Sequence, residues 1–250
     1  MKQLLLILLA LLPALCGTAK CKGGNLWVWP TSPFASTNTV FVLSAKSSGQ
    51  EVLANLNTKY PIYLVAANRR VRLRVREVCG GQHLTMQAVL VPVELLVVGA
   101  EYRLLIENIP EHDSLVVQNP ETGRLEAPHW KVSASRAPKP IAWLQRPQVG
   151  KGSKAGWYVT FDYALAIRGE YLLKTTVQGV GDSLKTTSYL ATGPSQVYVG
   201  QGLCSKDFVL ADRSRYEVTF DVLDAQGRVL AWRGPPIPFS TNWNGHYSGK

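Results

Sequence analysis

Short runs of apolar residues, many of them β-branched or aromatic, alternate along the chain with clusters rich in Gly, Pro, Asn and Ser. Such runs predict β-strands, because β-branched and aromatic side chains pack well on a pleated surface. In the first half the predicted strands are residues 40–43, 61–66, 71–78, 84–91, 102–106 and 115–117. In the second half they are residues 156–161, 171–177, 184–190, 196–199, 216–223 and 229–232. Since only residues 50–57 suggest a helical turn, the pattern predicts an all-β fold.

The first 19 residues follow a different pattern. Lys2 precedes an apolar run from Leu4 to Leu15, and the small residues Gly17, Thr18 and Ala19 follow it. This order is typical of a cleaved signal peptide, residues 1–19, and the run is too short to span a bilayer permanently. We therefore expect an exported protein, whether periplasmic, surface-associated or secreted. No later run approaches the roughly 20 apolar residues of a membrane helix, so we expect no transmembrane segment in the mature chain.

A polar segment divides the remaining chain into two halves of similar size. Residues 134–140 combine small side chains, two prolines and positive charge, a composition typical of a semi-rigid linker. The predicted domains are residues 20–133 and 141–240, each near the usual size of a β-sandwich, followed by a flexible tail, residues 241–250. Trp143 and Trp157 are the candidates for the aromatic centre of the second core.

One spacing occurs in both halves. Leu96 precedes Tyr102 by six residues, and Leu210 precedes Tyr216 by six residues. This resembles the tyrosine corner of immunoglobulin-like and fibronectin type III sandwiches. The resemblance implies two tandem antiparallel immunoglobulin-like domains, in which each leucine fills a core and each tyrosine hydroxyl bonds the upstream backbone. The N-terminal half also resembles the bacterial immunoglobulin-like modules that serve as spacers, adhesive units or scaffolds.

The chain is basic, and its arginines are patterned. The formal net charge is +10, and it falls to +9 when Lys2 leaves with the signal peptide. Arg70, Arg72, Arg74 and Arg76 alternate with apolar residues, which places four guanidinium groups on one strand face about 6.6 Å apart. Such a row can bind a linear polyanion. The alternative is a solvated outer face whose charge is balanced across the sheet, for example by Glu101 and Glu107.

Four cysteines are present, and Cys16 lies within the predicted signal peptide. At most one disulfide can then form, and we expect Cys21 to pair with Cys79, because both belong to the N-terminal domain. Cys204 is expected to be a packed apolar thiol. A lipid anchor is disfavoured, because Leu15 or Lys20 stands where a small residue should precede the lipidated cysteine.

The sequence offers no pattern for catalysis, a cofactor or a metal. His83, His112, His129 and His246 have no ligand-like spacing, whereas a zinc site needs three or four converging donors. No motif places a histidine beside a serine and an aspartate, so a catalytic triad is unsupported. We therefore expect no cofactor, no metal and no enzymatic activity.

These expectations combine into a function class. We expect an exported, non-enzymatic binding, adhesive or structural module of a bacterial envelope or exterior. Its expected partners are an anionic polysaccharide, lipopolysaccharide or another envelope protein, while nucleic acid is disfavoured. Two alternatives stay open: a periplasmic chaperone of the pilus-assembly kind, which also has a signal peptide and two sandwich domains, and an envelope hydrolase.

Overall fold

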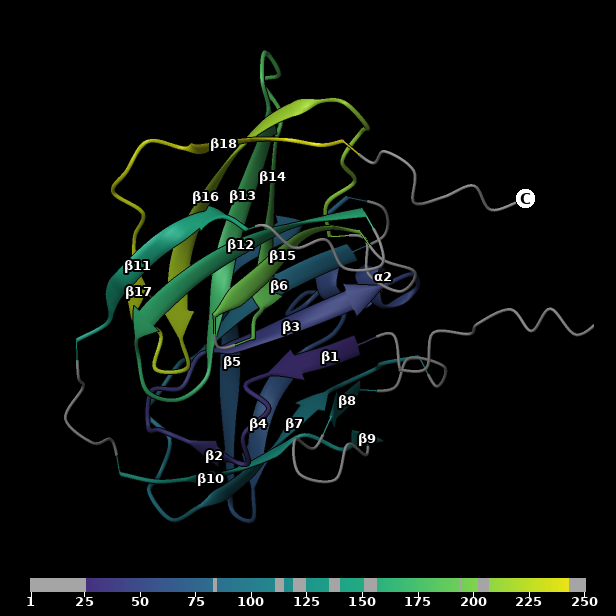
Figure 1. The fold of residues 1–250 in the computed structure, drawn as a ribbon. Helices are drawn as coiled ribbons and strands as arrows, with labels where there is room; N and C mark the ends of the chain where they lie inside the picture. Colours follow the sequence, from purple (N-terminus) through teal and green to yellow (C-terminus); the bar gives the residue numbers. More distant parts are fainter. Residues whose placement is uncertain are drawn as a thin grey trace, which may run out of the picture.

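A computed structural model of the 250-residue chain describes residues 26–82, 85–110, 115–118, 125–134, 140–150, 157–193, 195–201 and 207–242. The prediction of an all-β fold is confirmed: within these residues strands dominate, and the helix α2 (Gly49–Ala54) falls where a helical turn was predicted. The predicted signal peptide, Cys21, Cys204 and most of the predicted linker and tail lie outside the described residues. Figure 1 shows the arrangement of the strands.

The N-terminal lobe, which comprises the described residues up to 134, is a single path of hydrogen-bonded strands in the order β2-β10-β7-β4-β5-β6-β3-β1-β8-β9. The strands are β1 (Leu26–Trp29), β2 (Phe34–Ala35), β3 (Phe41–Lys46), β4 (Ile62–Ala66), β5 (Arg69–Gly80), β6 (Thr85–Pro92), β7 (Glu101–Ile106), β8 (Leu115–Gln118), β9 (Leu125–Glu126) and β10 (His129–Val132). The pairings of β1 with β8 and of β2 with β10 are parallel.

The long strand β5 connects the two halves of this path. Its first residues, Arg69 to Arg72, pair with β4, and residues from Leu73 onward pair with β6. The two halves enclose a core in which Phe41 meets the fully buried Trp130 edge-on, with ring centroids 4.7 Å apart. Because β5 pairs with both halves, the path of hydrogen-bonded strands is continuous even though the two halves pack face to face around a sandwich-like core.

The C-terminal lobe, which comprises the described residues from 140, is built from two antiparallel sheets. One has the order β11-β12-β15, and the other has the order β14-β13-β16, with β17 and β18 both pairing with β16. The strands are β11 (Ala142–Val149), β12 (Trp157–Ala166), β13 (Tyr171–Gly179), β14 (Lys185–Ala191), β15 (Gln196–Gln201), β16 (Arg215–Asp224), β17 (Val229–Leu230) and β18 (Ile237–Ser240).

The aromatic centre of the C-terminal core differs from the prediction. Phe161 contacts Phe220 and Phe239 edge-on at 5.2 and 5.4 Å. Trp143 packs at the margin of this core, and Trp157 is 41% exposed. Trp157 has the same strand parity as Phe161 but stands at the start of β12, where its side chain is exposed. The alternation of the strand therefore identified which side chains face inward, but not which of them are buried in the core.

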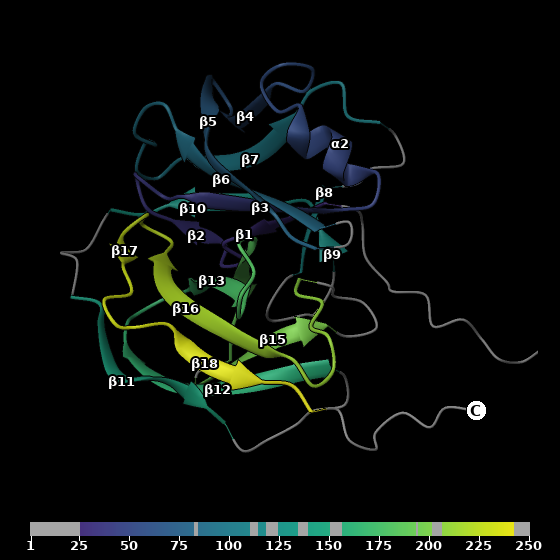
Figure 2. The ribbon, with the colours of Figure 1, turned by 90° about the horizontal axis from the view of Figure 1, so that it is seen from above.

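The two lobes pack directly against each other, as Figure 2 shows with the N-terminal lobe in purple to teal and the C-terminal lobe in teal-green to yellow. A separate apolar cluster fills this contact, which we call the seam. Its buried members are Trp29, Val40, Val42, Cys79 and Val89 from the N-terminal lobe and Leu172, Tyr189 and Leu223 from the C-terminal lobe. A core shared by the two halves was not predicted from the sequence.

Across the described residues, no helix combines the length and the apolar character that a bilayer crossing requires.

Candidate functional site

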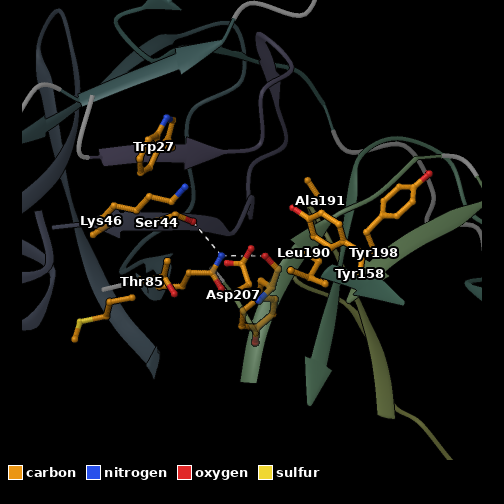
Figure 3. Close-up of a pocket in the computed structure, with 13 residues that line it drawn as sticks. Trp27, Ser44, Lys46, Thr85, Tyr158, Leu190, Ala191, Tyr198 and Asp207 are labelled. Atoms are coloured by element: carbon orange, nitrogen blue, oxygen red, sulfur yellow. Dashed lines mark hydrogen bonds between the residues drawn. The ribbon is translucent and has the colours of Figure 1, made fainter. Parts of the chain in front are cut away.

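A cleft of about 540 Å³ opens between the two lobes, beside the seam. The N-terminal lobe contributes Trp27 from β1 and Lys46 from β3, and the C-terminal lobe contributes Tyr158 from β12 and Tyr198 from β15. Asp207 lies between these walls, as Figure 3 shows. Clefts of this size that combine aromatic walls with a few polar groups are the usual form of a ligand site.

Strand alternation presents Trp27 to the cleft. Its neighbours Leu26 and Val28 are buried in the N-terminal core, so the intervening side chain faces outward. The Lys46 ammonium lies 5.1 Å from the centroid of the Trp27 ring, within the range of a cation–π contact. The Trp27 indole also carries an N–H group that can donate to a ligand.

The opposite wall consists of two tyrosines. Tyr158 and Tyr198 stand on neighbouring strands that pair in antiparallel register, and their rings meet edge-on at 6.2 Å. The Tyr198 hydroxyl donates to the side-chain oxygen of Gln196 at 2.9 Å. Because that bond holds the phenol, the Tyr198 ring is already oriented before any ligand arrives.

Asp207 is the acid of the cleft. Burial raises the pKa of this carboxyl group, while the nearby Lys46 ammonium and the Ser188 hydroxyl act in the opposite direction. The Ser188 hydroxyl oxygen lies 3.3 Å from an Asp207 carboxyl oxygen and shares its single proton between Asp207 and Gln87. The cleft thus offers one ammonium, one carboxyl group and one indole N–H between aromatic faces, a set suited to hydrogen bonding rather than to binding a strong net charge.

The amide of Gln87, another residue that lines the cleft, joins the two lobes. Its nitrogen donates to the Tyr189 carbonyl at 2.9 Å and to the Ser44 hydroxyl at 3.0 Å. Its oxygen accepts from the Tyr189 N–H at 2.6 Å and from the Ser188 hydroxyl at 3.0 Å. The side chain therefore pairs with the backbone of the edge strand β14 as another strand would, and its hydrogen-bonding capacity is used within the protein.

Glu77 makes the second polar connection of the seam. Its carboxylate accepts from Lys174 at 2.5 Å and from the Tyr189 hydroxyl at 2.8 Å. Burial acts to raise the pKa of Glu77, but the bonds from Lys174 and Tyr189 outweigh it, so the pKa is lowered. Elsewhere in the seam, the Glu170 carboxylate accepts the N–H groups of Thr31 and Ser32. The lobes that form the cleft are thus held by charged contacts as well as by apolar packing.

The four predicted arginines lie on β5 and all are exposed, but they do not form one uniform row. The Arg70 guanidinium pairs with the Glu107 carboxylate at 2.6 Å, and its central carbon lies 3.5 Å from the centroid of the Tyr63 ring. The bond to Glu107 raises the pKa of Arg70. Arg72 donates to the side chain of Asn57 at 3.3 Å. Glu107 thus balances this face as the alternative interpretation expected, whereas Glu101 stands opposite Lys131.

A β-bulge between Val75 and Glu77 interrupts the alternation. Before it, Val71 and Leu73 face the N-terminal core; after it, Cys79, of the same parity, faces the seam. Arg76 is the inserted residue, and its guanidinium approaches Gly227 of the C-terminal lobe. A bulge adds one residue to a strand and so reverses which side chains face inward. Only Arg70, Arg72 and Arg74 therefore share the regular outer face.

Each lobe contains one of the two leucine–tyrosine pairs. Leu96 and Leu210 are buried, the Val97 N–H donates to the Tyr102 hydroxyl at 3.3 Å, and the Ala211 N–H donates to the Tyr216 hydroxyl at 2.7 Å. Tyr102 is buried, whereas Tyr216 is half-buried. Both hydroxyls thus accept a bond from the backbone five residues upstream, a geometry that stabilises a crossing loop and plays no part in the cleft.

Cys79 is a free, buried cysteine, and no disulfide is present among the described residues. Its predicted partner, Cys21, lies outside them. Burial in the seam raises the pKa of the Cys79 thiol to about 12, and the neighbouring Glu77, which accepts a 3.4 Å contact from the sulfur, acts in the same direction. This thiol is therefore protonated and unreactive at neutral pH.

No family model and no curated protein matches this chain. Solved structures similar to it include type I pullulanase of Bacillus subtilis str. 168 complexed with maltose, at 10% identity and a TM-score of 0.26, covering 84% of this chain and 24% of the other. The FN1–FN3 domains of chicken CNTN1 are similar at 11% identity and a TM-score of 0.28, and the match covers 88% of this chain and 66% of the other. A two-domain fibronectin type III segment of chicken tenascin is similar at 11% identity and a TM-score of 0.21, and the match covers 86% of this chain and 96% of the tenascin segment. This chain thus spans about a quarter of the pullulanase it matches.

Proposed function

We propose that this protein is an exported, non-enzymatic binding module that takes a saccharide ligand in the cleft between its lobes. The observation that carries the proposal is the pair of aromatic walls, Trp27 on one lobe and Tyr158 with Tyr198 on the other, on either side of polar groups. Sugar rings have apolar C–H faces and a rim of hydroxyl groups, so they suit a site that combines aromatic faces with hydrogen-bonding groups.

The polar groups fit the hydroxyl rim of such a ligand. The Trp27 indole N–H and the Lys46 ammonium can donate, and the Asp207 carboxylate can accept. Because Lys46 and Asp207 offset each other in charge, the cleft does not require a highly charged ligand. An acidic sugar remains compatible, since its carboxylate can meet the Lys46 ammonium.

The seam supports binding by pre-organisation. Gln87 and Glu77 of the N-terminal lobe connect the two lobes through their partners Tyr189 and Lys174, which belong to the C-terminal lobe. Holding both walls in place removes the ordering cost that a mobile two-domain protein would meet on binding.

An array of bacterial polysaccharide fragments probed with the mature protein tests the proposal. We expect retention of at least one saccharide class, with W27A and Y198A each weakening it by about tenfold or more, as loss of a buried aromatic contact predicts. W157A is the matched control, because Trp157 neighbours Tyr158 on β12 but lies on the other face. The proposal fails if no saccharide is retained, or if W157A weakens retention as much as W27A does.

A further inference from the structure

The loop that connects β6 to β7 exposes several apolar side chains. Val93, Leu95, Val97 and Val98 all point to solvent, and Leu95 is 67% exposed. Only Leu96 of this stretch is buried, because it fills the core beside Tyr102. The loop is held firmly: the Leu96 N–H donates to Thr37, and the Gly99 N–H donates to Val132 at 2.8 Å.

Phe34 extends this apolar surface. It lies on β2, whose next residue, Ala35, pairs with Val132 of β10, the residue that also accepts from Gly99. Phe34 is 62% exposed. We call Phe34, Val93, Leu95, Val97 and Val98 together the apolar end of the N-terminal lobe. Contiguous exposed apolar surface is uncommon on a soluble protein and usually marks a contact with a partner or a membrane.

Basic side chains adjoin the apolar end. The Val93 N–H donates to the Arg72 carbonyl at 3.0 Å, and Arg69 pairs with Glu94 within the loop at 2.7 Å. Phe34 stands opposite Lys131 in the sheet. Across the same outer face, the register aligns Arg70 with Val65 and Val65 with Arg103. The basic residues of this face, which also include Arg74, outnumber its acids Glu94, Glu101 and Glu107.

We propose that this end of the N-terminal lobe docks on an anionic lipid surface, with the apolar end entering the interfacial region and the arginine face meeting the headgroups. Apolar side chains at a tip with cations behind them match the depth profile of a bilayer interface, where acyl chains lie beneath negative headgroups. The apolar residues project from a loop rather than lining a groove. A fluid bilayer accepts such a projection without a complementary hollow, whereas a protein partner would need one.

The surface is separate from the cleft. The cleft is lined by residues around Trp27, Lys46 and the start of β6, whereas the apolar end follows the last residue of β6, Pro92. The lipid proposal therefore does not depend on the saccharide proposal, and one can fail while the other stands.

Co-sedimentation of the mature protein with large unilamellar vesicles tests the proposal. One set contains equal parts of phosphatidylglycerol and phosphatidylcholine, and the other contains phosphatidylcholine alone. We expect binding to the anionic vesicles at about 50 mM NaCl and release at about 500 mM, because salt screens exposed charges. L95D should weaken binding by about tenfold or more. In the combined R70S, R72S and R74S variant, binding to the anionic vesicles should fall about fivefold for each arginine removed.

The matched control is L144D. Leu144 is a 72% exposed leucine on β11 of the other lobe, so the same change there should leave vesicle binding unaltered. V98D repeats the test at a second exposed position, and far-UV circular dichroism verifies that the variants are folded. Equal binding to both kinds of vesicle, binding to neither, or equal losses from L95D and L144D would overturn the proposal. Self-association that L95D abolishes, without vesicle binding, would overturn it in favour of a protein interface.

Discussion

Removal of the Gln87 side chain should weaken the whole molecule, not only one lobe. The side-chain amide satisfies both the N–H and the C=O of Tyr189, at 2.6 and 2.9 Å, across a separation of 102 residues. In Q87A both backbone groups lose their partner in a partly buried site. A buried group left unsatisfied costs about 1–3 kcal/mol, so with some access to water we expect Q87A to lose about 2–4 kcal/mol of unfolding free energy.

A second variant separates hydrogen bonding from packing. Q87M keeps most of the side-chain volume but can make neither bond to Tyr189. If the loss comes from the hydrogen bonds, Q87M should lose nearly as much unfolding free energy as Q87A. If it comes from packing, the stability of Q87M should stay close to that of the wild type. Q145A is the control, because Gln145 is an exposed glutamine of β11 and its loss should change stability by less than about 0.5 kcal/mol.

The assay is equilibrium urea unfolding followed by tryptophan fluorescence and by far-UV circular dichroism. We expect the wild type to unfold in one transition in which both probes coincide, because the lobes share a core. Q87A should shift the midpoint down by about 1 M urea or separate the transition into two steps. A Q87A protein within about 0.5 kcal/mol of wild type, with a single unchanged transition, would refute the view that Gln87 couples the lobes.

Three further predictions concern single groups. Y216F should lose about 1 kcal/mol of unfolding free energy in thermal or urea unfolding, because the Ala211 N–H loses its acceptor, and no loss would show that water replaces the phenol without cost. Cys79 should resist modification by Ellman's reagent at pH 7.5 until the protein unfolds, since its thiol pKa is raised to about 12; rapid labelling of the native protein at this residue would contradict its burial. Because the pKa of Glu77 is lowered on folding, its stabilisation is complete above its ordinary value of 4.5 and is lost as the pH falls through the folded-state pKa. Urea unfolding at pH 7 and at about pH 3 should therefore show a larger acid-induced loss for wild type than for E77Q, and equal losses would contradict this role.

Local pattern was sufficient to predict most strands of this fold, but β1, β2, β9, β10, β11 and β18 were not predicted. Strand β16 follows from apolar residues at alternate positions, and the pairs Leu96–Tyr102 and Leu210–Tyr216 were visible because their spacing is fixed along the chain. The exposed arginines of β5 followed from the same period of two. These features depend on residues close in sequence, so one chain without relatives can show them.

The seam and the cleft could not be predicted in this way. Nothing in the neighbourhood of Gln87 indicates that its amide meets Tyr189, and nothing near Trp27 indicates a facing Tyr198. The arginine pattern does not reveal the bulge before Glu77, because the alternation of Arg and apolar residues continues through Arg76 in the sequence. One signal was available: Glu77 occupies the parity of Val71 and Leu73, and a carboxylate at a core position indicates either a bulge or a partner charge.

The most direct test of the cleft is an NMR titration that follows the indole N–H signals of the seven tryptophans. The protein is labelled with ¹⁵N and titrated with the saccharide that the array retains best. We expect the Trp27 signal to shift progressively and to saturate, while the signal of Trp157 stays in place. A saturating titration that moves other indole signals and leaves Trp27 unchanged would contradict binding between the lobes.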